Sequence, residues 1–172
     1  MVVAHRGGLA WFKGRDHHIA VRSFRGGLEL SLDALNPATL GMSIDAGSLE
    51  ETSPDFTPQQ KAIIKRELDD IVLESAKYPT ITFNSTFIRG SISGGPFQVE
   101  VGGRITLHGV TRHVIIPVTI TVTERSFNAK GTFELKRSDF GVKATSAFRG
   151  WVRVKDKLTF TFDINAKPVY EG

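Results

Sequence analysis

The residues best suited to chemistry lie near the amino terminus, where Asp16, His17 and His18 follow one another. Histidine and aspartate are common metal ligands, and histidine is also the usual general acid or base. This segment is predicted to be a strand, on which neighbouring side chains point to opposite faces. His17 and His18 therefore cannot easily share one metal ion, and a site would need a distant ligand such as His108 or His113. We predict no metal site, and whether the cluster binds anything stays open.

A hydrolytic triad could also be assembled from Ser138, His108 and Asp139. The sequence has no G-x-S-x-G nucleophile elbow, however, and no cysteine for thiol catalysis. The glycine pairs at 94–95 and 102–103 lack the strand-to-helix setting of a phosphate loop. We predict that the protein is not an enzyme and uses no cofactor. A small lipid-directed or metal-dependent enzyme stays open as the alternative.

Arg137 is the charged residue that alternation places on an inward strand face, near the end of that strand. A charge in this position needs a partner. Asp139 could supply it within the protein, and an anionic headgroup could supply it from a ligand. The run Arg137-Ser138-Asp139 is expected to have mainly a structural role, and Arg137 is also a candidate ligand-binding residue.

These residues must be positioned by two long alternating segments that meet at a turn. Strict period-2 alternation is typical of strands with one buried side. The turn is Leu107-His108-Gly109-Val110-Thr111-Arg112, in which Gly109 permits positive φ and Thr111 offers a side-chain hydrogen bond. His108 and His113 are expected to be exposed. The residues predicted to face inward are Phe97, Val99, Val101, Gly103, Ile105 and Leu107 before the turn and Val114, Ile116, Val118, Ile120 and Val122 after it.

The remaining chain contains further strands and one helix. Gly26-Gly27 predicts a break between two early strands, and Ile81, Phe83, Ser85 and Phe87 are expected to share one face of a later strand. Thr57, Pro58 and Gln60 predict a helix start with a capping box. The helix is expected at about 58–76, with its apolar stripe turned inward. That stripe is Ile63, Ile64, Leu68, Ile71, Val72 and Ala76.

About eight or nine strands joined by short turns predict a mainly β protein. Closure into an antiparallel β-barrel would hide every strand edge, and roughly eight strands enclose space for one small ligand. We therefore predict a closed barrel with one inserted amphipathic helix. A two-sheet sandwich is the alternative that the strand pattern leaves open.

Composition limits the function classes. The 172 residues suit one domain, residues 1–172, and a net charge of +4 without a basic tract gives no reason to expect nucleic acid. The longest apolar runs fall well short of the roughly 18 residues needed to span a bilayer. The start of the sequence shows no signal peptide, which predicts a cytoplasmic protein as written, or a periplasmic one if a leader was removed.

Four segments in order resemble the YceI-like family. They are the run LHGVTR at 107–112, the run RSDFG at 137–141, the segment YPTITFNS at 78–85 and the closing segment LTFTF at 158–162. The chain departs from the family at TPQQK, residues 57–61, where many members carry an R-D-x-H-L stretch. Its histidine-bearing first strand resembles that of a divergent branch.

The resemblance implies a lipocalin-like antiparallel barrel whose apolar tunnel binds, carries or transports a polyisoprenoid, such as an isoprenoid quinone or prenyl chain. It also implies that homodimers are common. The chain has 12 Phe but only 2 Tyr and 2 Trp, and such nonpolar rings suit a dry tunnel wall as well as a filled core. The candidate ligand-binding residues are Phe83, Phe87, Phe97, Val99, Ile105, Val118, Ile120, Phe133, Phe148, Phe160, Phe162 and Arg137. A ligand-free barrel that serves as an interaction domain stays open as a further alternative.

Overall fold

The computed structural model describes residues 1–7, 16–31, 34–90, 96–123, 126–143 and 153–167. Ten strands, one α-helix and three short helical turns make up this part of the chain. The strands are β1 (Val2–Gly7), β2 (His17–Val21), β3 (Phe24–Ser31), β4 (Ala34–Asp45), β5 (Leu49–Glu51), β6 (Thr80–Gly90), β7 (Phe97–Leu107), β8 (Val110–Thr123), β9 (Ser126–Lys136) and β10 (Arg153–Ala166). The helix is α1 (Pro58–Glu67).

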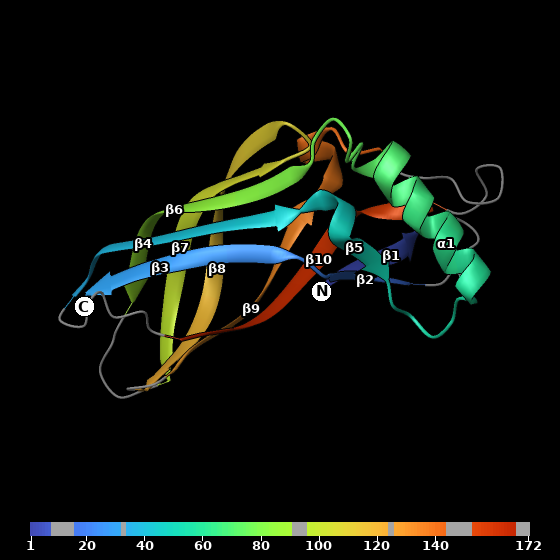
Figure 1. The fold of residues 1–172 in the computed structure, drawn as a ribbon. Coiled ribbons are helices and arrows are strands. Elements are labelled where there is room, and N and C mark those ends of the chain that lie inside the picture. Colours follow the sequence, from blue (N-terminus) through green and yellow to red (C-terminus); the bar gives the residue numbers. More distant parts are fainter. Residues whose placement is uncertain (8–15, 32–33, 91–95, 124–125, 144–152, 168–172) are drawn as a thin grey trace.

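All ten strands belong to one antiparallel sheet that curls around an interior (Figure 1). Its strand order is β3-β4-β6-β7-β8-β9-β10-β1-β2-β5. The prediction of a mainly β, lipocalin-like fold with one helix is confirmed. The closed ring is not observed, because the order has two ends and no ladder joins the end strands, β3 and β5, among the described residues. The far half of β10, after Thr161, pairs with β9 alone in this part of the chain.

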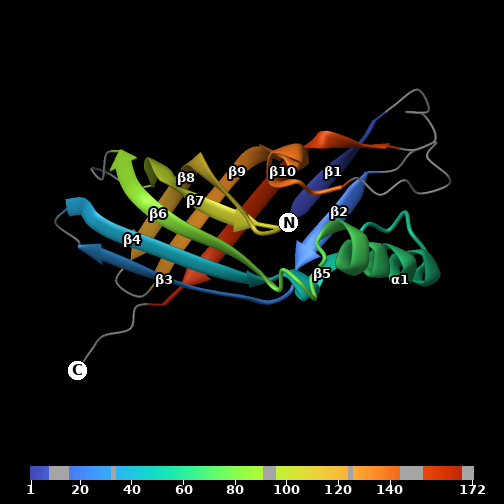
Figure 2. The same ribbon diagram turned by 90° about the horizontal axis from the view of Figure 1, so that it is seen from above.

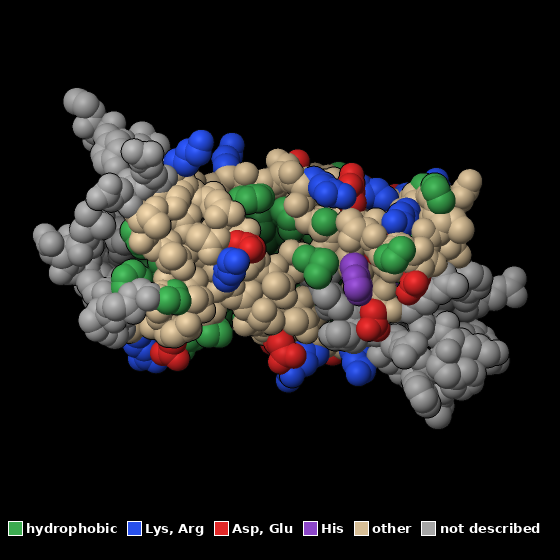
Figure 3. Space-filling view, turned by 90° about the horizontal axis from the view of Figure 1, so that it is seen from below, with side chains coloured by type: hydrophobic (Ala, Val, Ile, Leu, Met, Phe, Trp, Pro, Cys, Tyr) green, Lys and Arg blue, Asp and Glu red, His purple; other side chains and the backbone are tan. Residues whose placement is uncertain are grey.

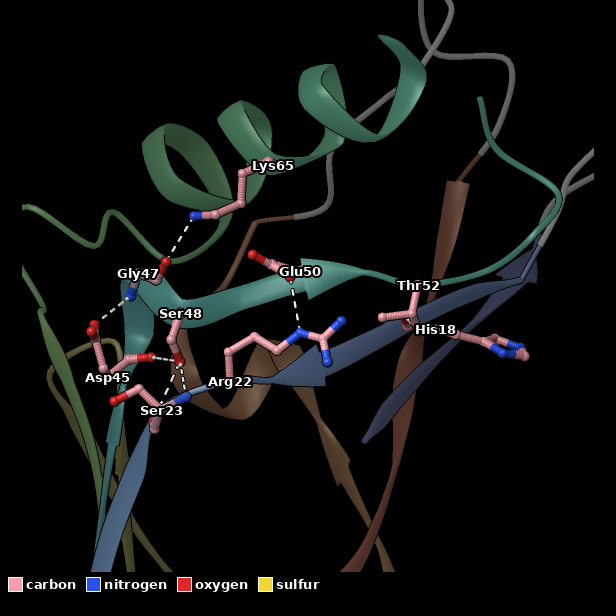
Figure 4. Close-up of polar contacts among 9 residues, drawn as sticks. All are labelled: His18, Arg22, Ser23, Asp45, Gly47, Ser48, Glu50, Thr52 and Lys65. Atoms are coloured by element: carbon pink, nitrogen blue, oxygen red, sulfur yellow. Dashed lines mark hydrogen bonds and ion pairs between the residues drawn. The ribbon is translucent and has the colours of Figure 1, made fainter. Parts of the chain in front are cut away.

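The two ends of the strand order meet at one corner of the sheet. There the chain passes from β2 to β3 through Arg22 and Ser23, and from β4 to β5 through the 3-10 turn Ala46–Ser48. The Arg22 N–H donates to the Ser48 carbonyl at 3.2 Å, and the Asp45 N–H donates to the Ser23 carbonyl at 3.1 Å. Figure 4 shows how these polar residues gather at the corner. The break predicted at Gly26-Gly27 is therefore wrong: both glycines lie inside β3, and the chain bends four residues earlier.

The LHGVTR run forms the tight β7–β8 hairpin as predicted. Leu107 pairs with Val110, so the turn has two residues, His108 at φ 52° and Gly109 at φ 73°. Two positive φ values are the requirement of a type I′ turn, whose twist matches that of the flanking strands. The hydroxyls of Thr106 and Thr111 lie 2.8 Å apart across the two strands.

The alternation predicted for the two strands of this hairpin is confirmed. Their inward residues include the most deeply buried aliphatic side chains of the sheet, with Val101 at 3% and Val99 at 4% exposure. The residues opposite them on β8 are also buried, namely Ile116, Val118 and Ile120. The inward faces of these two strands therefore form a continuous apolar part of the core.

Strand β6 departs from its predicted alternation. Its register against β7 shifts between Ser85 and Phe87, so Thr86 is the extra residue of a β-bulge. Beyond the bulge, Ile88 pairs with inward-facing Val101 and is 4% exposed, whereas Phe87 pairs with Gly102. The Phe87 ring lies under the Arg89 guanidinium, 5.3 Å from it. The prediction that Phe87 points inward is therefore wrong, because a one-residue insertion exchanges the two faces of a strand.

Helix α1 begins as predicted but ends early. Thr57 and Gln60 form the capping box, and Pro58 occupies the first turn. The α-helix stops at Glu67, one wider π-helical turn follows at Leu68–Val72, and Glu74 takes a left-handed φ of 46° that ends the helical path. The helix predicted at 58–76 is thus shorter than expected.

The inward stripe of the helix is also narrower than predicted. Ile64, Leu68 and Val72 are partly buried at spacing i, i+4, i+8, whereas Ile63 and Ile71 are 56% and 47% exposed. Figure 2 shows α1 lying at one end of the curled sheet, next to β5. Because the helix covers only the end of the interior, a single row of its side chains is enough to contact the inward-facing residues there.

Candidate ligand-binding cavity

The curled sheet encloses a cavity of about 1630 Å³. Its wall comes from β2 to β5 and from β6 to β10. Ile64 and Glu67 of α1 and Leu68 and Val72 of the π-helical turn after it also contribute to the lining. Most of the lining is aliphatic or aromatic. Seen from below, the surface opens into a hollow in which hydrophobic side chains are visible (Figure 3).

Eight of the twelve predicted ligand-binding residues line this cavity. They are Phe83, Ile105, Val118, Ile120, Phe133, Phe160, Phe162 and Arg137. Phe97 and Val99 face inward but belong to the packed core rather than to the lining. Phe87 lies on the outer face, for the reason given above. Phe148 lies outside the described residues.

Three phenylalanines from adjacent strands form a connected aromatic strip on the wall. Phe133 of β9 and Phe160 of β10 are cross-strand partners, and their rings stack with centroids 5.1 Å apart. The ring of Phe162 meets that of Phe133 edge-on at 6.4 Å. All three residues are only partly buried, and all three line the cavity.

Glycines on the inward face make room for two of the rings. Gly103 lies under Phe83, and a Cβ on it would stand 2.5 Å from that ring. Gly131 lies under Phe162, and a Cβ there would also stand 2.5 Å from the ring. Each ring thus lies close over the backbone of its glycine, in space that a side chain at that position would take.

The candidate ligand-binding residues chosen from the sequence include none from β3 or β4, although both strands contribute to the wall. Leu28, Leu40, Met42 and Ile44 line the cavity beside Gly26 and Gly27. The alternation of apolar residues along β4 was the signal that could have found them. For β3, the break predicted at Gly26-Gly27 divided one continuous strand into two short segments.

Arg137 lines the cavity, and its guanidinium contacts other groups of the protein. Its guanidinium donates to the Val142 carbonyl at 3.0 Å, and its Nε lies 3.8 Å from a carboxylate oxygen of Asp156. Asp139, the partner within the protein that the sequence offered, is exposed and makes no ion pair with Arg137 in the described part of the chain, so that pairing is not formed. The RSDFG run forms a 3-10 turn, Arg137–Phe140, which is anchored by the fully buried ring of Phe140 and closed by Gly141 at φ 66°.

The turn that carries Arg137 is tied to β10 through Asp156. The Ser138 hydroxyl donates to one oxygen of this carboxylate at 2.7 Å, and the Ser138 N–H donates to the other at 3.0 Å. These two hydrogen bonds lower the pKa of Asp156, although desolvation opposes them. The contacts support the structural role predicted for this run.

The histidine cluster is split between the two faces of β2. His17 lines the cavity together with Ile19 and Val21. Its Nδ1 lies 2.7 Å from Oε2 of Glu51, whose side chain is 0% exposed, and its ring stacks on Phe56 with centroids 5.0 Å apart. Among the described residues, no group of three or more His, Cys, Asp or Glu side chains could hold a metal ion.

His108 was expected to be exposed, and that prediction is wrong. Its side chain is 11% exposed, because it lies between Glu74 and Tyr78. The ring Nε2 donates to the Glu74 carboxylate at 2.6 Å, and this hydrogen bond, against a smaller desolvation effect, lowers the pKa of Glu74. His113 is exposed as predicted. The YP and LHG motifs therefore pack against each other and hold the end of the helical segment to the β7–β8 turn.

The described helices include none that is long and apolar enough to cross a bilayer.

Comparison with known proteins agrees with this geometry. The family model for the YceI-like domain matches residues 3–166, which is nearly the whole chain. The chain belongs to the YceI-like family. A UPF0312 protein of Vibrio cholerae serotype O1 (strain M66-2) is 32% identical over 147 residues, which are 81% of this chain and 69% of that protein. A UPF0312 protein of Pseudomonas savastanoi pv. phaseolicola is 31% identical over 124 residues, 66% of this chain and 58% of that protein.

Solved structures share the fold at lower identity. BcnA of Burkholderia cenocepacia superposes with a TM-score of 0.71 at 20% identity, over 96% of this chain and 94% of that chain. A polyisoprenoid binding domain from Saccharophagus degradans, implicated in plant cell wall breakdown, gives a TM-score of 0.70 at 13% identity, over 95% and 90%. These likenesses show that the YceI-like chain shares its fold with these two solved structures.

Proposed function

We propose that this YceI-like protein binds and carries a long-chain isoprenoid lipid in the interior of its curled sheet. The observation that carries the proposal is the apolar cavity of about 1630 Å³. Cavities for drug-sized ligands occupy roughly 300–1,000 Å³, so this one is large enough for a longer chain. A polyisoprenoid or the tail of an isoprenoid quinone has the length and the purely apolar surface that such a wall accepts.

The driving force would be removal of hydrocarbon from water, at about 0.8 kcal/mol for each buried CH₂ group. The aromatic strip of Phe133, Phe160 and Phe162 offers no hydrogen-bonding groups that the ligand would leave unsatisfied. The structural neighbour from Saccharophagus degradans, described as a polyisoprenoid binding domain, supports the same ligand class. Binding and transport need no catalytic group, which agrees with the prediction that the protein is not an enzyme.

The first test is native mass spectrometry of freshly purified protein, followed by solvent extraction and identification of any bound molecule. We expect one long-chain isoprenoid lipid per cavity. An empty protein that also fails to bind added geranylgeraniol would contradict the proposal and favour the ligand-free interaction domain or an enzyme that releases its product.

A double variant tests whether the cavity wall holds the lipid. Replacing Phe133 and Phe160 by Thr puts two hydroxyls on the aromatic strip while keeping residues that suit strands. We expect the bound lipid to be lost from a protein that still shows the circular dichroism of a β-sheet. Phe87→Thr is the matched control, because its ring lies on the outer face of the sheet, and it should retain the lipid. Retention by a folded double variant would place the ligand elsewhere.

A further inference from the structure

A histidine–glutamate pair is built into the wall of the largely apolar cavity, at the end near α1. The strand that carries His17 pairs with β5, and β5 contacts α1. The His17 side chain is 24% exposed and lines the cavity, whereas the Glu51 side chain behind it is fully buried. Burying a carboxylate is costly unless its oxygens accept hydrogen bonds.

Glu51 accepts three such bonds, and they divide between its two oxygens. Oε1 accepts from the backbone N–H of His18 at 3.1 Å and of Ser53 at 2.8 Å. These two bonds fix the path of the chain after β5. Oε2 is 2.7 Å from Nδ1 of His17. The contact with His17 is therefore additional to what the local backbone requires.

This contact determines which ring nitrogen of His17 carries the proton. A carboxylate can only accept hydrogen bonds, so Nδ1 of His17 is the donor. In a neutral imidazole the other nitrogen, Nε2, is then an acceptor. Stacking on Phe56, with an angle of 8° between the rings, holds the imidazole in one plane. No residue in the described part of the chain makes a hydrogen bond to Nε2.

We propose that Nε2 of His17 accepts a hydrogen bond from the hydroxyl headgroup of an isoprenoid alcohol or phenol, whose chain lies along the aromatic strip of Phe133, Phe160 and Phe162. This inference rests on the proposed function, because it supposes that an isoprenoid fills the cavity. The buried charge of Glu51 directly behind the ring disfavours an anionic headgroup at this point. A hydroxyl, which is neutral and can donate, matches the site in both charge and hydrogen bonding.

The test compares two ligands that differ only in the donor: geranylgeraniol and its methyl ether. Their dissociation constants are measured by displacement of 1-anilinonaphthalene-8-sulfonate from the full chain and from two variants. His17→Phe keeps the ring and its stacking on Phe56 but removes Nε2. The matched control is His18→Phe, since His18 is the next residue on the same strand and its side chain points to the opposite face.

We expect the ratio of the two dissociation constants, ether over alcohol, to fall about fivefold to tenfold in His17→Phe, as the loss of one hydrogen bond predicts. The ratio should be unchanged in His18→Phe. If both ligands bind and the ratio is the same in His17→Phe as in the wild type, the headgroup inference is wrong while the proposed function stands. If neither ligand binds the wild type, both proposals fail.

A second measurement covers the case in which His17→Phe does not fold, because Glu51 would lose one donor. In wild-type protein labelled with ¹⁵N, the Nε2 resonance of His17 should have the shift of an unprotonated nitrogen. It should move on addition of the alcohol and stay in place on addition of the ether. Equal responses to the two ligands would overturn the inference without any substitution.

Discussion

The hydrogen bond between Glu74 and His108 joins the end of the helical segment to the β7–β8 turn. It lowers the pKa of Glu74 below the ordinary value of 4.5. A carboxyl group whose pKa is lower in the folded protein stabilises it above the unfolded pKa, and this stabilisation is lost as the pH falls through the folded pKa. Glu74 also holds a left-handed backbone conformation, which a substitution that changes only the charge would leave in place.

We therefore expect Glu74→Gln to unfold at lower urea concentration than the wild type at pH 7. The difference between the two proteins should shrink as the pH falls below 4.5, the ordinary pKa of the carboxyl group, because protonation then removes the advantage of the charged form. Urea unfolding at a series of pH values measures this. Glu100→Gln is the control, since its pair with Arg89 is exposed and should contribute little. A difference that stays constant down to pH 3 would show that the charge of Glu74 is not the cause.

Among the strands, β7 carries two neighbouring glycines that face opposite sides of the sheet. A Cβ at Gly103 would stand 2.5 Å from the inward ring of Phe83 and 2.7 Å from the Asn84 carbonyl. The atoms nearest to a Cβ at Gly102 would all belong to the outward ring of Phe87, the closest at 2.1 Å. Moving the Asn84 carbonyl costs more free energy than moving the end of a side chain, and Phe83 has only the cavity to move into.

Gly103→Ala is therefore expected to lower both stability and lipid capacity, with a cost of about 1–3 kcal/mol typical of overpacking. Gly102→Ala should leave lipid capacity unchanged, because Phe87 can swing toward solvent. Lipid extracted per mole of protein and the midpoint of urea unfolding separate the two effects. Equal lipid retention by the two folded variants would contradict the role assigned to Gly103.

The strand hairpins were predictable from sequence, but the local irregularities were not. Alternation placed Val101, Ile105 and Val118 on the inner face correctly, because side-chain direction in a regular strand follows position alone. It failed at Phe87, since nothing in the sequence 80–90 shows where the ladder with β7 gains an extra residue. Alternation also placed His17 and His18 on opposite faces correctly. It could not show the contact of His17 with Glu51, because that contact joins two strands through residues 34 positions apart in the chain.

For the molecule as a whole, lipid binding should appear as a gain in thermal stability. A ligand that binds only the folded state adds about 2.7 kcal/mol at a free concentration one hundred times its dissociation constant. For a chain of this size we expect the melting temperature of lipid-free protein to rise roughly 5–10 °C with geranylgeraniol. Differential scanning calorimetry measures the shift. The Phe133→Thr, Phe160→Thr double variant should show little of it, and an equal rise in both proteins would indicate binding outside the cavity.

The pairing of the first strand with the last determines the order in which the protein can fold. Among the described residues, strands β7, β8 and β9 pair only with their neighbours in sequence, so this part of the wall forms from local contacts. Val2, by contrast, pairs with Phe160 at the other end of the chain. Contacts of such long range carry the largest loop-closure entropy and form slowly. The nascent sheet should therefore present its apolar inner face to water until the two ends of the chain meet, and this interval is when it is most exposed to aggregation.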